Sequence, residues 1–189
     1  MFPPATRPVT RTLRDTGHHG RMDIELLSPA DVTPADIDAL AGILVDCVAG
    51  GASVGFLRSL DVPTARSWWL RALATPDVVT LVARRDGTIV GVVRLHPADQ
   101  PNGPHRAEVA KLLVHRRSRG RGVAKALMDR LEREALDRGR TVLVLDTQTG
   151  SDAERLYAAW GWRRVGVIDD YALDPDGTPE PTTIFTKTL

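Results

Sequence analysis

The amino-acid sequence predicts a single α/β (α+β) domain with a mixed central sheet of about seven strands flanked by about four helices. Three observations support this prediction. Runs of β-branched residues of strand length alternate with amphipathic stretches of helical spacing. No segment repeats, and no linker is long enough to divide the 189 residues into two domains. The predicted order of elements is β-α-α-β-β-β-α-β-α-β-β.

The N-terminal stretch differs in composition from the rest of the chain. Residues 1–21 mix Pro, Thr, Arg and Gly without an apolar period, so we expect a mobile tail that buries no core face. His18 and His19 have no Cys, Asp or Glu at metal-ligand spacing beside them, and no metal site is predicted. Residues 22–189 are expected to form the folded domain.

A strand, two helices and a β-hairpin are predicted in the first half of this domain. Thr33 can cap a helix that begins with Pro34, and Gly50 can end it. Asp86 and Gly87 favour the tight turn of a hairpin. The predicted segments are Asp23–Leu27, Pro34–Ala49, Pro63–Leu73, Val78–Ala83 and Thr88–Leu95.

Four strands and two helices are predicted in the second half. The longer helix carries apolar residues along one face, as a helix packed on a sheet should. In chain order the predicted segments are the strand Val109–Val114, the helix Val123–Arg138, the strand Thr141–Leu145, the helix Ala153–Trp160, and the strands Arg163–Ile168 and Thr183–Lys187.

The charge balance and the cysteine content limit the functional classes. The chain has 25 Lys and Arg against 24 Asp and Glu, so no global charge favours nucleic acid or an anionic membrane as a partner. Its single cysteine, Cys47, lies on an apolar helical face and is expected in the core. No apolar run approaches the ~20 residues of a membrane span, and a reducing cytoplasm is the expected location.

The segment from Val114 to Ala124 is the most informative part of the sequence. A strand end passes through a glycine-containing loop directly into a helix, which directs free backbone N–H groups and the positive end of the helix dipole at one point. Gly120 and Gly122 allow close approach of an anion. The charges of the loop arginines, Arg117, Arg119 and Arg121, surround the same point. We therefore predict a phosphate site.

Three phosphate-binding motifs and two simpler interpretations compete for this loop. A Walker A motif needs a Gly-Lys-Ser/Thr ending that is absent, and a dinucleotide fingerprint needs Gly or Ala where Lys125 stands. The remaining pattern is Arg-x-x-Gly-x-Gly, met by Arg117, Gly120 and Gly122. A solvated Arg/Gly turn and a nucleic-acid patch are the simpler alternatives. In this motif and in its order of elements, the chain over residues 23–189 resembles the GNAT acetyltransferases.

The resemblance implies a sheet that splays between the fourth and fifth strands, with acetyl-CoA bound in the gap. The strand Leu112–Val114 would bind the pantetheine amides, and the backbone from Arg117 to Ala124 would bind the pyrophosphate. Gly150 stands where the family usually has an asparagine that contacts coenzyme A, and Ser151 could replace that contact. The implied cofactor-binding residues are Leu112, Leu113, Val114, Arg117, Arg119, Gly120, Arg121, Gly122, Val123, Ala124 and Ser151.

Other segments resemble one branch of this family, the tabtoxin-resistance acetyltransferases. They are Gly50–Phe56, Pro101–Gly103, Arg106–Val109, Leu145–Thr147 and Lys187–Leu189. All of them lie outside the cofactor loop and so concern the acceptor substrate. The resemblance implies a small amino-acid-like antimetabolite with a free amine, and a role in resistance or detoxification.

Amine acetylation needs a group that removes a proton, because an alkylammonium has a pKa near 10.4. Glu108 begins the strand before the phosphate loop and Asp146 ends the strand after the long helix, so both can face one gap. The resemblance places both in the active site. The alternatives are that Glu108 pairs with Arg106 or Lys111, and that Asp146 caps the loop before the last helix.

Tyr157 is the third candidate catalytic residue. It lies one turn before Trp160, where the resemblance implies a tyrosine that protonates the leaving thiolate of coenzyme A. The alternative is a tyrosine that is packed for its ring alone.

The sequence thus favours an acetyl-CoA-dependent N-acetyltransferase of a small-molecule amine that uses no metal. A coenzyme A-binding sensor without activity, an acetyltransferase of a protein N-terminus or lysine, and an RNA- or ribosome-associated protein remain as alternatives. Both a monomer and a homodimer remain open.

Overall fold

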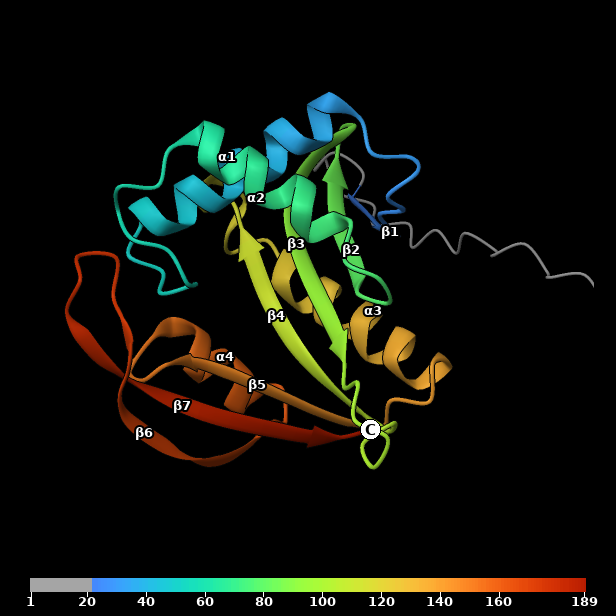
Figure 1. Cartoon of the computed structure of the whole chain (residues 1–189), viewed down its shortest axis with the longest axis vertical. Coiled ribbons are helices and arrows are strands. Elements are labelled where there is room, and N and C mark those ends of the chain that lie inside the picture. Colours follow the sequence, from blue (N-terminus) through green and yellow to red (C-terminus); the bar gives the residue numbers. More distant parts are fainter. Residues whose placement is uncertain (1–21) are drawn as a thin grey trace, which may run out of the picture.

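The computed structural model describes residues 22–189, so the predicted tail at residues 1–21 and its histidines lie outside the described part. The described chain forms one seven-stranded sheet of order β1-β2-β3-β4-β5-β7-β6 with four α-helices (Figure 1). The number and order of strands and helices confirm the prediction. The strands are β1 Met22–Leu26, β2 Val79–Arg85, β3 Thr88–Pro97, β4 Arg106–Val114, β5 Val142–Gln148, β6 Arg163–Leu173 and β7 Pro179–Thr188.

The helices form two layers around the sheet. They are α1 Pro34–Ala49, α2 Val62–Leu73, α3 Val123–Asp137 and α4 Asp152–Ala159, with a short 3-10 helix η1 at Arg116–Ser118. Helices α1 and α2 pack on one face of the sheet, where the fully buried Trp69 donates from Nε1 to the Leu40 carbonyl oxygen at 3.0 Å. The α3 helix covers the other face, and Tyr157 of α4 joins the same apolar cluster. None of the described helices is long and apolar enough to cross a membrane.

Local signals place the first helix and the hairpin where the sequence predicts them. Thr33 and Asp36 form a capping box, in which each side chain accepts a hydrogen bond from the backbone N–H of the other. Asp86 and Gly87 both have positive φ, which a two-residue hairpin turn of this twist requires. Cys47 is buried at the end of α1, as predicted.

The sheet is continuous at one end of β4 and β5 and open at the other. These two strands are the parallel pair of the mixed sheet, and their ladder consists of three partners, Arg106 with Val142, Ala107 with Leu143 and Glu108 with Val144. Beyond these residues the two strands run apart (Figure 1). The β4 backbone after Glu108 therefore has no ladder partner on its β5 side.

A β-bulge interrupts the pairing of β4 with β3. Val92 pairs with Leu113 and Arg94 pairs with Ala110, so Val93 stands opposite two residues, Lys111 and Leu112. The extra residue reverses the alternation of side chains along the strand. Residues before and after the bulge show this reversal, because Val109 packs with the α3 cluster whereas Leu113 packs with the α1 and α2 cluster.

The C-terminal hairpin is longer than predicted. Strand β6 continues to Leu173, beyond its predicted end at Ile168. Strand β7 begins at Pro179, before its predicted start at Thr183. Strand β6 is an edge strand that is exposed along most of its length, so its polar residues show no alternation that would reveal a strand. Pro179 precedes Thr182, where the pairing of β7 with β5 ends, so its missing N–H costs no bond to β5.

Candidate functional site

The N-terminus of α3 has the geometry of an anion site. Gly120 and Gly122 have φ of 70° and 75°, and a Cβ atom built on either would meet nothing within 4 Å. Gly122 is the N-cap residue and supplies no side chain to the first N–H groups of the helix, whose first turn holds no acidic residue. These N–H groups are therefore free to donate to a ligand. Open space and free donors fit the pyrophosphate of coenzyme A.

Helix α3 approaches the sheet closely just behind this loop. A Cβ atom on Gly91 of β3 would lie 2.9 Å from Val123 Cγ1 and 3.2 Å from Leu127 Cδ1. Only glycine leaves room for the helix at this distance. Gly91 thus sets the position of the first turn of α3 relative to the strands.

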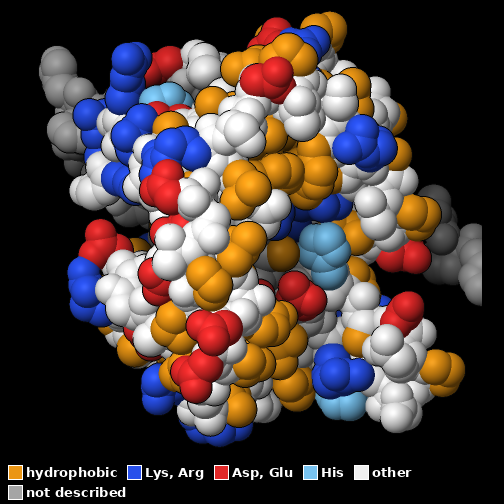
Figure 2. Space-filling view, turned by 60° about the vertical axis from the view of Figure 1, so that its left-hand side comes forward, with side chains coloured by type: hydrophobic (Ala, Val, Ile, Leu, Met, Phe, Trp, Pro, Cys, Tyr) orange, Lys and Arg blue, Asp and Glu red, His pale blue; other side chains and the backbone are white. Residues whose placement is uncertain are grey.

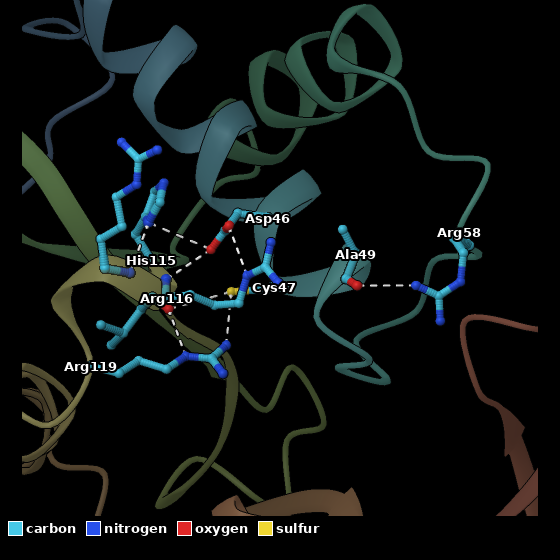
Figure 3. A network of polar contacts seen from close by, with 9 residues as sticks. Asp46, Cys47, Ala49, Arg58, His115, Arg116 and Arg119 are labelled. Atoms are coloured by element: carbon cyan, nitrogen blue, oxygen red, sulfur yellow. Dashed lines mark hydrogen bonds and ion pairs between the residues drawn. The ribbon is translucent and has the colours of Figure 1, made fainter.

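Helix α1 anchors the loop from the other side (Figure 3). The Asp46 carboxylate accepts hydrogen bonds from the Arg116 backbone N–H at 2.8 Å and from Arg116 Nε at 2.9 Å. His115 Nδ1 lies 3.5 Å from the same carboxylate. Burial alone would raise the pKa of Asp46, but these hydrogen bonds and neighbouring charges bring the pKa below its ordinary value. The charge of Arg116 is therefore used within the protein.

The three arginines predicted around the phosphate divide into two groups. Arg119 turns its guanidinium inward, with Nε donating to the Val114 carbonyl oxygen at 3.2 Å and Nη2 donating to Cys47 Sγ at 3.6 Å (Figure 3). All three arginines are exposed, but within the described chain the side chains of Arg117 and Arg121 form no hydrogen bond or ion pair. The last two thus have the freedom to meet a phosphate, while Arg119 holds the loop on α1.

The predicted pantetheine-binding strand lies where the sheet opens. Leu112 belongs to the bulge, Leu113 follows it, and Val114 ends β4 directly before the loop. Because the β5 ladder stops at Glu108, this part of the β4 backbone faces the opening between the strands. An extended ligand can add to such an edge through backbone hydrogen bonds.

Glu108 of β4 and Asp146 of β5 lie on the same face of the sheet where the strands separate, and their charges interact. Burial raises the pKa of Glu108, the Asp146 charge raises it further, and Lys111 acts in the opposite direction. In the described chain, Glu108 forms no ion pair with Arg106, whose Nη2 donates to Gln100 Oε1 at 3.4 Å. The helix after Asp146 is capped by a different residue, Ser151. Pairing with Arg106 and capping of the last helix thus do not account for the two carboxylates, whereas the Lys111 charge does act on Glu108 without a contact ion pair in the described chain.

Tyr157 lies beside the same opening but in the apolar layer. Its ring packs edge-on against Trp160 and Trp162, with centroid distances of 5.9 Å to each, and is tilted on Phe185 at 6.0 Å. Burial, and after it the nearby Asp146 charge, raise the pKa of the Tyr157 hydroxyl above its ordinary range. The phenol therefore stays protonated near neutral pH, which a proton donor requires. Ring packing, the alternative role, is also present.

Ser151 begins α4. Its Oγ accepts a hydrogen bond from the Glu154 N–H at 3.2 Å, which satisfies one of the free donors of the helix. The hydroxyl hydrogen takes no part in this bond. Ser151 can therefore cap the helix and donate to a ligand at the same time.

Three basic side chains lie on the face of Glu108: Arg94 and His96, which the sequence did not single out, and Lys111, which it offered only as a pairing partner of Glu108. Alternation along β3 places Arg94 and His96 on the face that carries Glu108, and the bulge brings Lys111 to that face. The space-filling view shows a hollow near the middle of one side of the molecule. Basic side chains are recessed in it, a histidine lies at its edge and an acidic side chain lies close by (Figure 2). The described residues include no group of three or more His, Cys, Asp or Glu that could hold a metal ion.

Comparison with known proteins agrees with this geometry. The chain is 34% identical over 116 residues to an IAA acetyltransferase of Azospirillum brasilense, covering 61% of this chain and 71% of that protein. It is 32% identical over 135 residues to the L-2,4-diaminobutyric acid acetyltransferase of Streptomyces coelicolor, covering 67% of this chain and 77% of that protein. Several other relatives are longer, and the chain spans between 30% and 47% of their length.

A solved structure shares the fold. The yncA protein from Salmonella typhimurium, solved with its cofactor acetyl-CoA, superposes with a TM-score of 0.71 at 21% identity over 89% of this chain and 94% of that one. The model of the acetyltransferase (GNAT) family matches residues 52–162, which is more than half of the sequence. The chain therefore belongs to the acetyltransferase (GNAT) family of enzymes.

Proposed function

We propose that the protein is an acetyl-CoA-dependent N-acetyltransferase that acetylates a primary amine of a small molecule by direct transfer. The observation that carries this proposal is the pair Glu108 and Asp146, which lie on two neighbouring strands where the sheet begins to open and whose charges interact. Transfer to an amine needs a group of this kind, because the amine arrives protonated at neutral pH.

Acetyl-CoA, when bound, supplies the acetyl group as a thioester. The free N–H groups around Gly120 and Gly122 would hold its pyrophosphate, with Arg117 and Arg121 beside them. The β4 backbone at Leu112–Val114 would hold the pantetheine amides and direct an N–H at the carbonyl oxygen, and Ser151 would donate one further hydrogen bond.

The proton path uses three side chains. Glu108 or Asp146, directly or through water, takes the proton from the acceptor ammonium, and the amine nitrogen then attacks the carbonyl carbon. The Tyr157 hydroxyl gives its proton to the sulfur as the carbon–sulfur bond breaks. The raised pKa makes Glu108 a stronger base than an ordinary glutamate, and the raised pKa of Tyr157 keeps its hydroxyl protonated until the sulfur leaves.

We further propose an amino-acid-like antimetabolite as the acceptor, with resistance or detoxification as the biological role. The segments that resemble the tabtoxin-resistance branch support this. Within Gly50–Phe56, the Val54 carbonyl oxygen accepts a hydrogen bond from Lys111, which lies on the face of Glu108. Within Leu145–Thr147 lies Asp146 itself.

A thiol-release assay tests the proposed function. Acetyl-CoA is combined with amino acids, amino-sugar antibiotics and lactam-containing dipeptides, the release without amine is subtracted, and the N-acetyl product is identified by mass spectrometry. We expect release of one thiol for each product formed with at least one of these amines. Binding of acetyl-CoA by calorimetry without transfer to any small amine would instead favour a sensor or a protein acceptor.

A further inference from the structure

Lys111 has an unusual backbone and an unusual position. It is the residue inserted at the β4 bulge, and its φ of 54° lies in the left-handed region that side-chain-bearing residues seldom adopt. Such conformations cost about 1–3 kcal/mol and persist mainly where a function or the surrounding structure requires them. Here the bulge has one clear result: it turns the lysine to the face of the sheet that carries Glu108.

The Lys111 ammonium is held in place by the α1–α2 side of the molecule. Its Nζ donates to the Val54 carbonyl oxygen at 2.9 Å and lies 5.6 Å from the ring centroid of Trp68 and 6.0 Å from that of Phe56. An ammonium has three donors, and the Val54 bond uses one. The two rings fix the direction of the group without using the others.

The positive charge at this place has no contact ion pair within the described chain. Glu108 and Asp146 are close enough to favour the charged form of Lys111, although burial lowers the pKa of this lysine overall, but neither forms an ion pair with it. Arg94 is a second buried cation nearby, and its guanidinium donates to neutral oxygens, the Ala72 carbonyl and the Thr80 hydroxyl. Two cations and two carboxylates thus share one face of the sheet.

We infer that Lys111 binds a carboxylate of the acceptor, so that the substrate class is an amino acid or a similar zwitterion whose ammonium faces Glu108 and Asp146. This inference rests on the proposed function. The cation of Lys111 and the neighbouring carboxylates match the two charges of a zwitterion, and a charge-assisted hydrogen bond from Lys111 would place the amine beside its base. His96, whose pKa burial and the charges of Arg94 and Lys111 lower to about 4, is neutral near pH 7 and adds no competing charge.

The test compares pairs of amines that differ by one carboxylate. The pairs are L-2,4-diaminobutyrate with 1,3-diaminopropane, L-lysine with cadaverine, and L-methionine with L-methioninamide. For the wild type we expect kcat/KM to be about 10- to 100-fold higher for the acid of a pair, the usual worth of one hydrogen bond between charged groups. Lys111→Met should remove this preference by lowering kcat/KM for the acid alone, and Lys111→Arg should keep part of it.

Two comparisons separate recognition from general effects. The ratio within each pair cancels the different amine pKa values when wild type and variant are compared at one pH. Arg71→Met removes an exposed positive charge from α2 and should leave every ratio unchanged. If Lys111→Met does not fold, the acid-to-neutral ratios of kcat/KM in the wild type and in Lys111→Arg still test the role of Lys111.

The outcomes distinguish the inference from the proposed function. Equal kcat/KM for acids and their neutral partners in the wild type, or an unchanged preference in Lys111→Met, would overturn the role of Lys111 and leave acetyl transfer to amines intact. Absence of transfer to every amine would overturn both. A preference for the acids that disappears in Lys111→Met and persists in Arg71→Met would establish the carboxylate site.

Discussion

At the scale of single residues, the environment of Glu108 determines what this carboxyl can do. Burial raises its pKa first, and the Asp146 charge raises the pKa further because a nearby like charge opposes ionisation. A base acts only when deprotonated, so the rate should fall as pH decreases through the raised Glu108 pKa. The pH at which the rate falls therefore depends on the charge of Asp146.

Asp146→Asn should move the acidic limb of the pH–rate profile to lower pH. The substitution removes a negative charge that raises the Glu108 pKa, so Glu108 should stay deprotonated at more acidic pH. The measurement is kcat/KM against pH for wild type and variant with the same amine. Asp137→Asn, an exposed charge at the end of α3, should leave the limb in place. A limb that does not move in Asp146→Asn would show that the two carboxyls are independent.

Tyr157→Phe should lower the rate without recovery at alkaline pH. The phenylalanine keeps the ring contacts with Trp160, Trp162 and Phe185 but has no proton to give to the thiolate. We expect a loss of about 10²–10⁴-fold in kcat, the usual worth of a general acid, with acetyl-CoA affinity and Tm near wild type. Wild-type turnover in this variant would reduce Tyr157 to a packing residue.

At the scale of elements, the first turn of α3 links the sequence motif to a binding site. Gly122→Val places a side chain in the space where we propose the pyrophosphate lies, and it also forces a β-branched residue into positive φ. Gly139→Val provides a matched control, because Gly139 ends the same helix with φ of 70° and equally open surroundings. Both variants should lose stability from backbone strain of about 1–2 kcal/mol.

Calorimetric titration with acetyl-CoA separates the two glycine variants. We expect Kd to rise at least about 10-fold for Gly122→Val and to stay near the wild-type value for Gly139→Val, with similar decreases in Tm. Equal acetyl-CoA affinity in the two variants would show that the pyrophosphate does not bind at the N-terminus of α3.

Most elements could be predicted because their signals are local. Thr33 with Pro34, and Asp86 with Gly87, are adjacent in sequence and act on their own backbone. The phosphate loop is likewise one contiguous motif. The extension of β6 to Leu173 had no such signal, because an exposed edge strand needs no apolar alternation.

The parts of the site that were missed depend on contacts between distant segments. The orientation of Lys111 follows from a bulge against β3, and no sequence signal near Lys111 predicts this bulge. The inward turn of Arg119 needs Cys47, 72 residues earlier, as its partner. The pairing of β4 with β5 places Glu108 and Asp146 on one face of the sheet, and their place in the active site stays a prediction.

At the scale of the whole molecule, α1 joins the cofactor side to the rest of the sheet through an aspartate at each end. Asp36 accepts a hydrogen bond from Arg84 Nη1 of β2 at 2.6 Å, and Asp46 accepts two from Arg116 beside the phosphate loop. The hydrogen bond from Arg84 is the main cause that lowers the pKa of Asp36, against the effect of burial. The pKa of Asp46 is lowered as well.

These lowered pKa values predict acid sensitivity. A carboxyl whose pKa is lower in the folded state stabilises the protein above the unfolded pKa, about 3.9 for aspartate, and this stabilisation is lost as pH falls through the folded pKa. Tm should therefore decrease between about pH 5 and pH 3. The Asp36→Asn/Asp46→Asn double variant should have a lower Tm at pH 7 and a smaller further decrease. The exposed pair Asp137→Asn/Asp169→Asn should follow the wild-type curve, and a wild-type slope in the first double variant would contradict this account.

The central claim is that the opening between β4 and β5 holds a carboxylate base for an amine. The most direct test is the rate of acetyl transfer from neutral to alkaline pH in Glu108→Gln and Asp146→Asn. We predict that substitution of the more important carboxylate lowers the rate about 10²–10⁴-fold near neutral pH. Part of the rate should return as pH approaches the pKa of the amine, because a larger fraction of the amine in solution is then already deprotonated. Wild-type rates in both variants across this range would contradict the claim.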